Sequence, residues 1–330
     1  MRPIAVLYEN EAWMAPLFAA LEAEGAPIER VFANARAFDP GADAPDWSLA
    51  VNKVSPSSYL RGHAPSIAFA RQFIPFLEGR GVPVVNGSEA FRLETSKALQ
   101  LLLLRGLGIR APRARVVHDV ARLAEASRGL RFPVIVKPNV GGSGALMRRF
   151  DGQAELREGA AGVDLGPDGT ALVQEYLEPA DGAIVRVEFL GGEYLYAIRI
   201  TSEGEQDFNL CPADICQLPD GAAFAERPEG DALDWSNCVV DAPAKRALRI
   251  EPCDPPDEMV AAVLRIARAG GLDVGGVEYL VAARDGLPYV YDINALSNFV
   301  TDAQRLVGFD PHRRFARYLL ARARGAAVAA

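Results

Sequence analysis

The chain has 330 residues, of which 50% are hydrophobic, and it carries a formal net charge of -8 at pH 7. A chain of this length exceeds one compact core and predicts two or three domains. The acidic balance, with no lysine- or arginine-rich block, argues against a nucleic acid partner. No apolar run approaches the roughly 18 residues of a membrane span, and the N-terminus turns polar too early for a signal peptide. We therefore expect a soluble, globular, cytoplasmic protein with no membrane partner.

Alternating strand-like and helix-like patterns fill residues 1–92. This alternation predicts a mainly parallel sheet, and hence a small doubly wound, Rossmann-like domain. The expected strands are residues 3–10, 27–32, 46–54 and 82–87, and the expected helices are residues 11–25 and 65–80.

The loop that follows the third expected strand is polar. Ligands of doubly wound domains bind beyond the carboxyl ends of the strands, which makes Asn52, Lys53 and Ser55 candidates for substrate contact. A simple polar turn before Pro56 is the commoner origin of such residues.

Lysine is scarce in this sequence, because only four of the 35 basic residues are lysine, at positions 53, 97, 137 and 245. An ammonium group is a compact charge that can enter a phosphate cluster, whereas guanidinium is planar and wide. Each retained lysine is therefore a candidate phosphate ligand, with chance survival as the alternative for any one of them. Lys97 also lies in the first turn of a predicted helix, where the dipole favours an acid, so we expect its partner to lie outside the helix.

Residues 132–144 (FPVIVKPNVGGSG) combine a β-branched strand with a flexible loop. The strand delivers Lys137 at its end, and the loop of Gly141, Gly142, Ser143 and Gly144 follows. Backbone N–H groups in such a loop can close around an anion without interference from Cβ atoms, and the lysine adds a full charge. The Walker and dinucleotide-binding patterns are both absent. The stretch indicates a phosphate cradle, although a glycine-rich hairpin alone is more often only a turn.

Two antiparallel strands are expected after the segment 174–178 (QEYLE), at residues 183–190 and 194–200. Arg186 and Glu188 lie two apart and so share a face of the first strand. An ion pair on the protein surface is the plain alternative to a functional pair.

Residues 289–299 (YVYDINALSNF) begin like a buried strand but place Asp292 and Asn294 on one face, where packing favours apolar side chains. A buried hydrogen-bonded pair would explain these two residues. A ligand that needs two oxygen-bearing side chains would explain them equally.

Six of these elements, in this order along residues 94–300, resemble the ATP-grasp superfamily. The nearest likeness is to its RimK-like (alpha-L-glutamate ligase-like) carboxylate–amine ligases. The elements are Lys97, Lys137 with GGSG, QEYLE, Arg186, Glu278 in GGVEYL, and DIN at 292–294.

The resemblance implies an α/β ATP-grasp fold in three parts. Residues 1–92 would form the Rossmann-like pre-ATP-grasp domain, and residues 93–173 the central subdomain with a glycine-rich lid. Residues 174–330 would form a C-terminal α+β subdomain with an antiparallel sheet and a cysteine-containing insertion at about 205–253.

The resemblance also implies the cofactors ATP and Mg²⁺, or Mn²⁺ in its place, and a role for each matching residue. Arg186 and Lys137 would be catalytic, and Glu278, Asp292 and Asn294 would bind the metal. The nucleotide-binding residues would be Lys97, Lys137, Gly141, Gly142, Ser143, Gly144, Gln174, Glu175, Tyr176, Leu177 and Glu178. Hard oxygen ligands of this kind suit magnesium.

The implied activity is an ATP-dependent, carbon–nitrogen bond-forming ligase that works through an acyl phosphate and joins an amino acid to an amino acid or peptide. The alternatives are an ATP-grasp kinase of a small molecule and a non-catalytic ATP-binding regulatory module. The complete set of two lysines and three metal-ligand candidates argues against the module.

Three departures from the RimK-like pattern indicate a different acceptor pocket. Asp292 replaces a more usual glutamate, Ile184 lies where an acid is common, and the loop after Asn209 reads LCPADICQLP. The candidate substrate contacts are Asn52, Asn209, Ser297 and Asn298.

All four cysteines, at positions 211, 216, 238 and 253, lie in or at the end of the predicted insertion. Their spacing matches no recognised zinc pattern, so reduced, buried or substrate-lining thiols are favoured and Zn²⁺ is the minor alternative. The basic, amphipathic segment 311–330 predicts a helix that packs on its own domain or on the mate of a homodimer.

Overall fold

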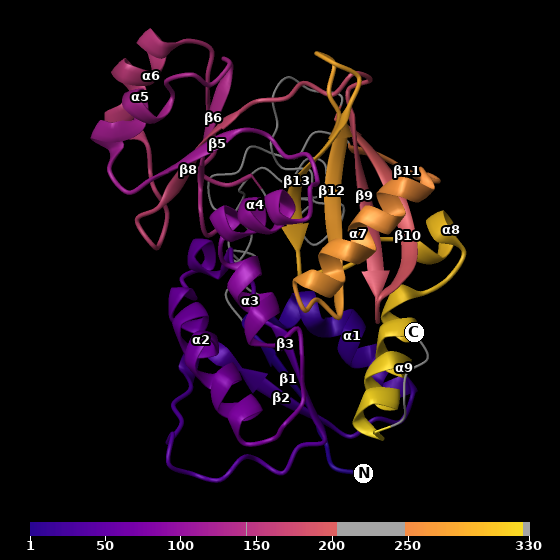
Figure 1. Cartoon of the computed structure of the whole chain (residues 1–330). Helices are drawn as coiled ribbons and strands as arrows, with labels where there is room; N and C mark the ends of the chain where they lie inside the picture. Colours follow the sequence, from indigo (N-terminus) through magenta and orange to yellow (C-terminus); the bar gives the residue numbers. More distant parts are fainter. Residues whose placement is uncertain (143, 203–247, 326–330) are drawn as a thin grey trace, which may run out of the picture.

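The computed structural model describes residues 1–142, 144–202 and 248–325. It contains three sheets, whose strands fall within residues 4–85, 114–175 and 183–294 (Figure 1).

The first sheet is parallel, as predicted, and has the strand order β2-β1-β3-β4. Alternate side chains of β1 point to opposite faces, so that Ile4 and Val6 pack with helix α1 while Ala5 and Leu7 pack with helix α2. Helices α1 and α2 therefore lie on opposite faces of the sheet. The elements are β1 (Ile4–Tyr8), α1 (Glu11–Ala23), β2 (Ile28–Phe32), η1 (Ala33–Ala35), β3 (Leu49–Lys53), η2 (Ser58–Arg61), α2 (Ala64–Gly79) and β4 (Val84–Val85).

The second sheet is antiparallel, with the order β5-β8-β6-β7. Its core is formed by apolar side chains of the strands and of short helices on one face, among them Val134, Phe150 and Leu156. Strand β8 ends at Glu175, two residues beyond the boundary expected at 173. The elements are β5 (Ala114–Val117), η3 (Val120–Arg122), α5 (Leu123–Ala126), β6 (Val134–Pro138), β7 (Arg148–Phe150), α6 (Gln153–Gly159), η4 (Ala160–Gly162) and β8 (Ala171–Glu175).

The third sheet is antiparallel, with the order β11-β10-β9-β12-β13. Its edge strand β11 is the last part of the segment expected to be an insertion. Helix α7 covers one face together with α3 and α4, which precede the second sheet in the chain (Figure 1). The elements are α3 (Ser88–Glu94), α4 (Lys97–Gly106), β9 (Ala183–Leu190), β10 (Glu193–Ser202), β11 (Leu248–Pro252), α7 (Asp257–Ala269), β12 (Val274–Val281) and β13 (Pro288–Asn294).

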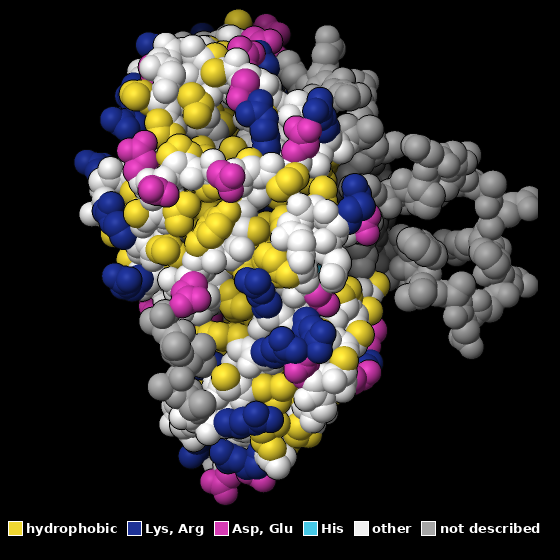
Figure 2. Space-filling model, turned by 90° about the vertical axis from the view of Figure 1, so that its right-hand side faces the viewer, with side chains coloured by type: hydrophobic (Ala, Val, Ile, Leu, Met, Phe, Trp, Pro, Cys, Tyr) yellow, Lys and Arg dark blue, Asp and Glu magenta, His cyan; other side chains and the backbone are white. Residues whose placement is uncertain are grey.

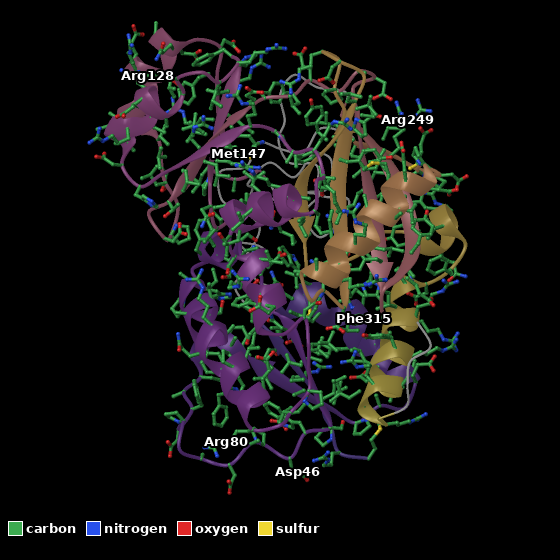
Figure 3. The ribbon with its side chains drawn as sticks, viewed as in Figure 1. Asp46, Arg80, Arg128, Met147, Arg249 and Phe315 are labelled. Carbon is green, nitrogen blue, oxygen red and sulfur yellow. The ribbon has the colours of Figure 1, made fainter. Side chains whose placement is uncertain are left out.

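The C-terminal helix α9 (Pro311–Ala323) returns to the first domain, whereas α8 (Ala303–Val307) packs beside β11 of the third sheet. Phe315 of α9 is buried in the same core as Phe18 of α1 (Figure 3). Arg313 Nε and Arg317 Nε donate to Glu24 Oε1 at 2.7 and 3.0 Å. The predicted amphipathic helix is confirmed, and it packs on α1 of its own chain. Figure 2 shows this side of the molecule, where basic and acidic side chains are interspersed.

Asn86, at the end of β4, joins the first domain to the third sheet. Its Oδ1 accepts from the N–H groups of Asp273 (2.8 Å) and Val274 (3.3 Å), and its Nδ2 donates to the carbonyl oxygens of Val274 (2.8 Å) and Ala295 (2.5 Å). Asn86 adopts φ 52°, a left-handed conformation that asparagine tolerates better than most residues. One buried side chain thus fixes the start of β12 and the end of β13 against the first domain.

Within the described ranges, no helix has the length and apolar character that crossing a membrane requires.

Candidate active site

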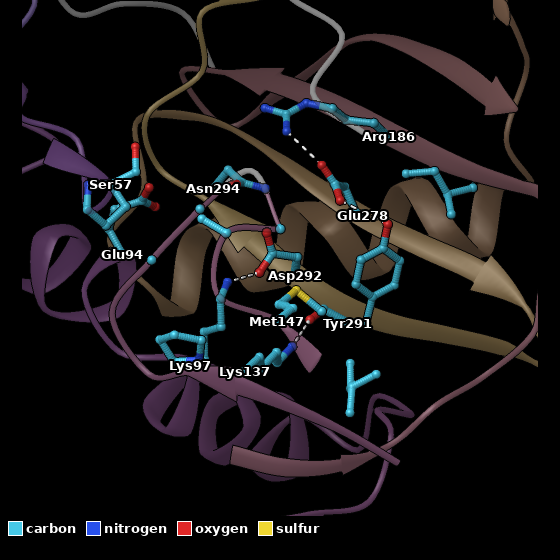
Figure 4. Close-up of a pocket in the computed structure, with 18 of the residues that line it drawn as sticks. Ser57, Glu94, Lys97, Lys137, Met147, Arg186, Glu278, Tyr291, Asp292 and Asn294 are labelled. Atoms are coloured by element: carbon cyan, nitrogen blue, oxygen red, sulfur yellow. Dashed lines mark hydrogen bonds and ion pairs between the residues drawn. The ribbon is translucent and has the colours of Figure 1, made fainter. Parts of the chain in front are cut away.

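Most of the predicted site residues line one cavity, which lies where the three sheets meet (Figure 4). The first domain contributes Trp13 and Ser57 to its wall, the second sheet contributes Lys137, and the third contributes Arg186 and Glu278. Residues from distant parts of the sequence are therefore brought together in one place.

The three predicted metal ligands lie on neighbouring strands and all line the cavity. Glu278 on β12 is the direct cross-strand neighbour of Asp292 on β13, and Gly276 is the neighbour of Asn294. The expected shared face of Asp292 and Asn294 is confirmed. A β-bulge next to Glu278 makes Tyr291 an extra residue, and its hydroxyl donates to Glu278 Oε2 at 2.9 Å.

Lys97 donates from Nζ to Asp292 Oδ1, which confirms the expected partner outside its helix (Figure 4). Burial raises the pKa of Asp292, but the charges of Lys97 and Lys137 outweigh it and hold this pKa below its ordinary value. Burial lowers the pKa of Lys97, and the attraction of Asp292 more than reverses that effect. The carboxylate and ammonium therefore stabilise one another in their charged forms.

Lys137 is buried beside this pair, and its Nζ donates to the carbonyl oxygen of Tyr291 at 3.4 Å. Burial, with a contribution from the nearby charge of Lys97, lowers the pKa of Lys137 to about 7. An incoming anion would relieve both effects, because it would compensate the charge of each lysine.

Arg186 lies between two carboxylates. Its Nε donates to Glu188 Oε1 at 2.6 Å and its Nη1 to Glu278 Oε1 at 2.9 Å. These side chains are buried in the cavity wall, so the alternative of a surface ion pair is wrong. A Cβ atom at Gly276 would lie 2.6 Å from Nη2 of Arg186, which explains physically why a glycine lies at this point of GGVEYL.

The glycine-rich loop borders the cavity through Gly141, Gly142 and Gly144, while Ser143 lies outside the described residues. Gly144 has φ 68°, a conformation that favours glycine. A Cβ atom at Gly141 would lie 3.3 Å from the hydroxyl oxygen of Tyr59. The loop therefore lies close to the first domain.

Gln174, Glu175, Tyr176 and Leu177 line the opposite end of the cavity wall, on and after β8. Gln174 Oε1 is buried and has no hydrogen-bond partner among the described residues. The carboxylate of Glu175 accepts from the Arg131 N–H (3.0 Å) and from Arg284 Nη1 (2.9 Å), so it holds the strand end in place.

Glu178 does not join this group. It is exposed and is absent from the described residues that line the cavity. Its backbone carbonyl accepts from the N–H of Ala283 at 2.8 Å, which ties the segment after β8 to the third sheet.

Only some of the candidate substrate contacts line the cavity. Asn298 lines the cavity, and its Oδ1 is buried without a hydrogen-bond partner in the described part of the chain. Ser297 is buried next to it, and its carbonyl oxygen accepts from Lys53 Nζ at 2.5 Å. Asn52 has a structural contact, because its Oδ1 accepts from the N–H of Val54 at 3.1 Å. Ser55 lines the cavity, and Asn209 lies outside the described residues.

Sequence reasoning missed several polar residues of the wall: Ser57, Glu94, Tyr291 and, as a site residue, Glu188. Burial raises the pKa of Glu94 to about 7, and its Oε2 accepts from the N–H of Ala295. The position of Tyr291 depends on the β-bulge, which strict strand alternation does not reveal. The pairing of Glu188 with Arg186 on one face was the available signal for Glu188.

The zinc alternative has no support here. Cys211, Cys216 and Cys238 lie outside the described residues, and Cys253 is a half-buried free thiol. Across the described ranges, no cluster of three or more His, Cys, Asp or Glu side chains has the arrangement of a metal site. Burial raises the pKa of the Cys253 thiol to about 11, as expected for a structural cysteine.

Comparisons with known proteins agree with the expected fold. No family model matches the sequence. A "Probable alpha-L-glutamate ligase" of Vibrio vulnificus (strain YJ016) is 28% identical over 189 residues, which are 54% of this chain and 57% of that protein. The chain thus matches little more than half the length of this curated relative.

Two solved structures match over nearly the whole chain. A RimK domain ATP-grasp protein from Sphaerobacter thermophilus DSM 20745 has a TM-score of 0.65 and 18% identity, with 96% of this chain and 99% of that one covered. The ATP-grasp ligase PsnB complexed with minimal precursor, Mg and ADP has a TM-score of 0.61 and 17% identity, with 97% and 98% covered. At these identities the likeness shows the fold, and the expected ATP-grasp fold is confirmed.

Proposed function

We propose that this ATP-grasp chain is an ATP-dependent ligase that joins a carboxylate to an amine through an acyl phosphate, with release of ADP and phosphate. The observation that carries the proposal is the arrangement of Glu278, Asp292 and Asn294 opposite Lys97 and Lys137 in one cavity. The similarity to the probable alpha-L-glutamate ligase of Vibrio vulnificus and to the ATP-grasp ligase PsnB supports the same reaction class.

The three oxygen-bearing side chains fit Mg²⁺, or Mn²⁺ in its place. Two carboxylates and a carboxamide are hard ligands, and Mg²⁺ is usually held by one or two carboxylates together with phosphates and water. Asn294 would bind the metal through Oδ1, while its Nδ2, which is buried without a hydrogen-bond partner among the described residues, would donate to a phosphate oxygen. Bound magnesium would hold and neutralise the phosphate oxygens of ATP.

The cationic side chains would position the phosphates. Lys97 would exchange its bond with Asp292 for a phosphate oxygen, and Lys137 would approach the same group from β6. Arg186 would stabilise the negative charge of the phosphoryl group during its transfer. Since the acyl phosphate is itself reactive, the contribution of the chain is mainly orientation and charge neutralisation.

The reaction would proceed in two steps. A carboxylate oxygen of the first substrate attacks the γ-phosphorus, the bond to the β–γ bridging oxygen breaks, and ADP leaves. The neutral amine then attacks the carbonyl carbon of the acyl phosphate, the carbon–oxygen bond breaks, and phosphate leaves as the nitrogen loses a proton. Water would destroy the intermediate, and the loop containing Gly141 and Gly144 would exclude it.

We further propose that the substrates are an amino acid and a second amino acid or a peptide. The support is that the Vibrio relative is named as a probable alpha-L-glutamate ligase and that PsnB was solved with a precursor bound.

The test is an assay of ADP and phosphate release with ATP, Mg²⁺ and a panel of amino acids and dipeptides. Hydroxylamine in place of the amine would trap an acyl phosphate as a hydroxamate, even when the true amine is missing from the panel. We expect release to need the acid, and the condensed product to be seen by mass. A phosphorylated product that never condenses would instead identify a kinase. Nucleotide binding without turnover or hydroxamate would favour the regulatory module.

A further inference from the structure

The inner end of the cavity has unsatisfied hydrogen-bond acceptors. Glu188 is 1% exposed, and its Oε2 has no hydrogen-bond partner among the described residues, although Oε1 accepts from Arg186. Asn298 Oδ1 is also buried without a hydrogen-bond partner among the described residues. Both residues line the cavity. A buried acceptor without a donor destabilises the fold, which indicates that a ligand supplies the missing donor.

Two residues join the surroundings of Glu188 to the loop that carries Asn298. Tyr196 is the cross-strand neighbour of Glu188, and its hydroxyl accepts from the N–H of Val300 at 3.0 Å. Burial lowers the pKa of Lys53 to about 8 against the opposing charges of Glu188 and Glu94, and its Nζ donates to the carbonyl of Ser297. The two acceptors therefore belong to one region of the wall.

The loop is held in a fixed shape. Ser297 Oγ accepts from the N–H of Phe299 at 3.1 Å, and Phe299 adopts φ 55°, which is strained for an aromatic residue. Together with the bonds from Lys53 and Tyr196, these contacts fix the loop on both sides of Asn298. The carboxamide is thus preorganised rather than free to find a partner elsewhere.

The polar groups of this region leave room for a hydrogen-bond donor. Arg186 is shared between two carboxylates, Glu188 and Glu278, and the buried ammonium of Lys53, another cation near Glu188, donates to the carbonyl oxygen of Ser297. Apolar side chains of Trp13, Ile184 and Phe299 line the same cavity. The indole of Trp13 is itself held in place, with the Arg61 guanidinium carbon 4.3 Å from its ring centre.

We propose that Glu188 and Asn298 form the subsite for the amine substrate, and that this substrate is a primary amine with an apolar or aromatic side chain. Two acceptors need two N–H donors, which a primary ammonium group supplies and a hydroxyl group cannot. The apolar walls would receive the side chain. The assignment to the amine substrate rests on the ligase proposed above.

A binding test separates the two proposals, because it needs no turnover. 2-Phenylethylamine and 2-phenylethanol are titrated into the full chain and followed by calorimetry. We expect the amine to bind at least about tenfold more tightly than the alcohol, and Glu188→Gln to reduce amine affinity at least about tenfold while leaving alcohol affinity unchanged. Glu193→Gln, an exposed acid on β10, is the matched control.

Equal affinities of the two probes for the unmodified chain, or unchanged amine binding by Glu188→Gln, would overturn the subsite. An equal loss of MgATP affinity in that variant would also overturn it, because it would assign Glu188 to the nucleotide. If Glu188→Gln fails to fold, Asn298→Leu gives the same decision from the other acceptor. Amine binding without hydroxamate formation would support the subsite and reject the ligase. Turnover by Glu188→Gln with an unchanged KM for the amine would support the ligase and reject the subsite.

Discussion

Lys97 and Asp292 form a partly buried ion pair between the first turn of α4 and the end of β13, 195 positions apart in the chain. The pair places an ammonium group, which we assign to the ATP phosphates, directly on a carboxylate that we assign to the metal. On nucleotide binding, Asp292 would contact the metal and Lys97 would contact a phosphate, so that two attractive contacts would replace the one between them. The charges of both residues are therefore compensated before and after nucleotide binding.

The first prediction concerns that carboxylate. Asp292→Asn should reduce turnover by about 100- to 1000-fold, because the amide is a weaker ligand for a hard cation and no longer compensates Lys97. ADP release at saturating MgATP would measure the loss. Asp46→Asn changes an exposed acid in the first domain and should leave turnover unaltered. Equal activity of the two variants would contradict the assignment of Asp292.

The second prediction concerns the space beside Arg186. Gly276→Ala should push the guanidinium away from β12 and reduce kcat by about 100-fold, since displacements of about 1 Å can have effects of this size. The far-ultraviolet circular dichroism should remain that of the unmodified chain. Gly106→Ala in α4 is a suitable control, because an added Cβ there meets open space. A Gly276→Ala enzyme with full kcat would show that the position of Arg186 is unimportant.

The third prediction concerns pH. Glu94 has a pKa of about 7 in the folded chain against an ordinary value of 4.5, because burial disfavours its charge. Between these two values the folded chain binds more protons than the unfolded chain. The contribution of Glu94 to the free energy of unfolding is therefore complete below about pH 4.5 and is lost as the pH rises through 7, by roughly 3 kcal/mol in total.

Glu94→Gln should remove this dependence, since a neutral amide does not titrate. Urea unfolding at pH 5 and pH 7.5 would measure the difference between the two chains. The exposed Glu89→Gln on the same helix should keep the pH dependence of the unmodified chain. Parallel curves for Glu94→Gln and the unmodified chain would show that Glu94 is not the titrating group.

Much of this fold could be predicted from local patterns. The parallel sheet of residues 4–85 follows from strands alternating with helices, and the β9–β10 hairpin follows from its Gly191–Gly192 turn. The packing of α3 and α4 on the third sheet could not be predicted in this way. It depends on long-range burial of Ala90 and Leu104 against Val277 and its neighbours, which no local pattern encodes.

The residues of the candidate site differ in the same way: some are indicated by local sequence patterns, and others only by the tertiary fold. Lys97 and Asp292 were predicted because charged groups stood where local structure disfavoured them, and Lys137 because it is one of few lysines and precedes a glycine-rich loop. No local pattern distinguishes Glu94 from an ordinary acid at a helix end. Only the tertiary fold buries it, where its Oε2 accepts from the N–H of Ala295. Asn52 looked exposed at a strand end, but in the folded chain its amide closes a backbone turn at Val54.

The fourth prediction concerns Asn86. Asn86→Ala should lower the free energy of unfolding by about 2–4 kcal/mol, because several buried N–H and C=O groups lose their partner at once. Chemical denaturation would measure the loss. Asn34→Ala, on the short helix η1 of the first domain, should have a much smaller effect. A change below about 0.5 kcal/mol for Asn86→Ala would show that water replaces these bonds without cost.

The contacts of Asn86 with Asp273 and Val274 also limit how this chain can be recombined with others. A hybrid that exchanges residues 1–92 would separate Asn86 from the backbone groups of Asp273 and Val274 that bond its amide, and would separate α1 from α9. The N-terminal domain is thus not a transferable module, although its doubly wound sheet looks complete in isolation. Altered substrate choice is better sought by changing the residues around Asn298 than by grafting whole domains.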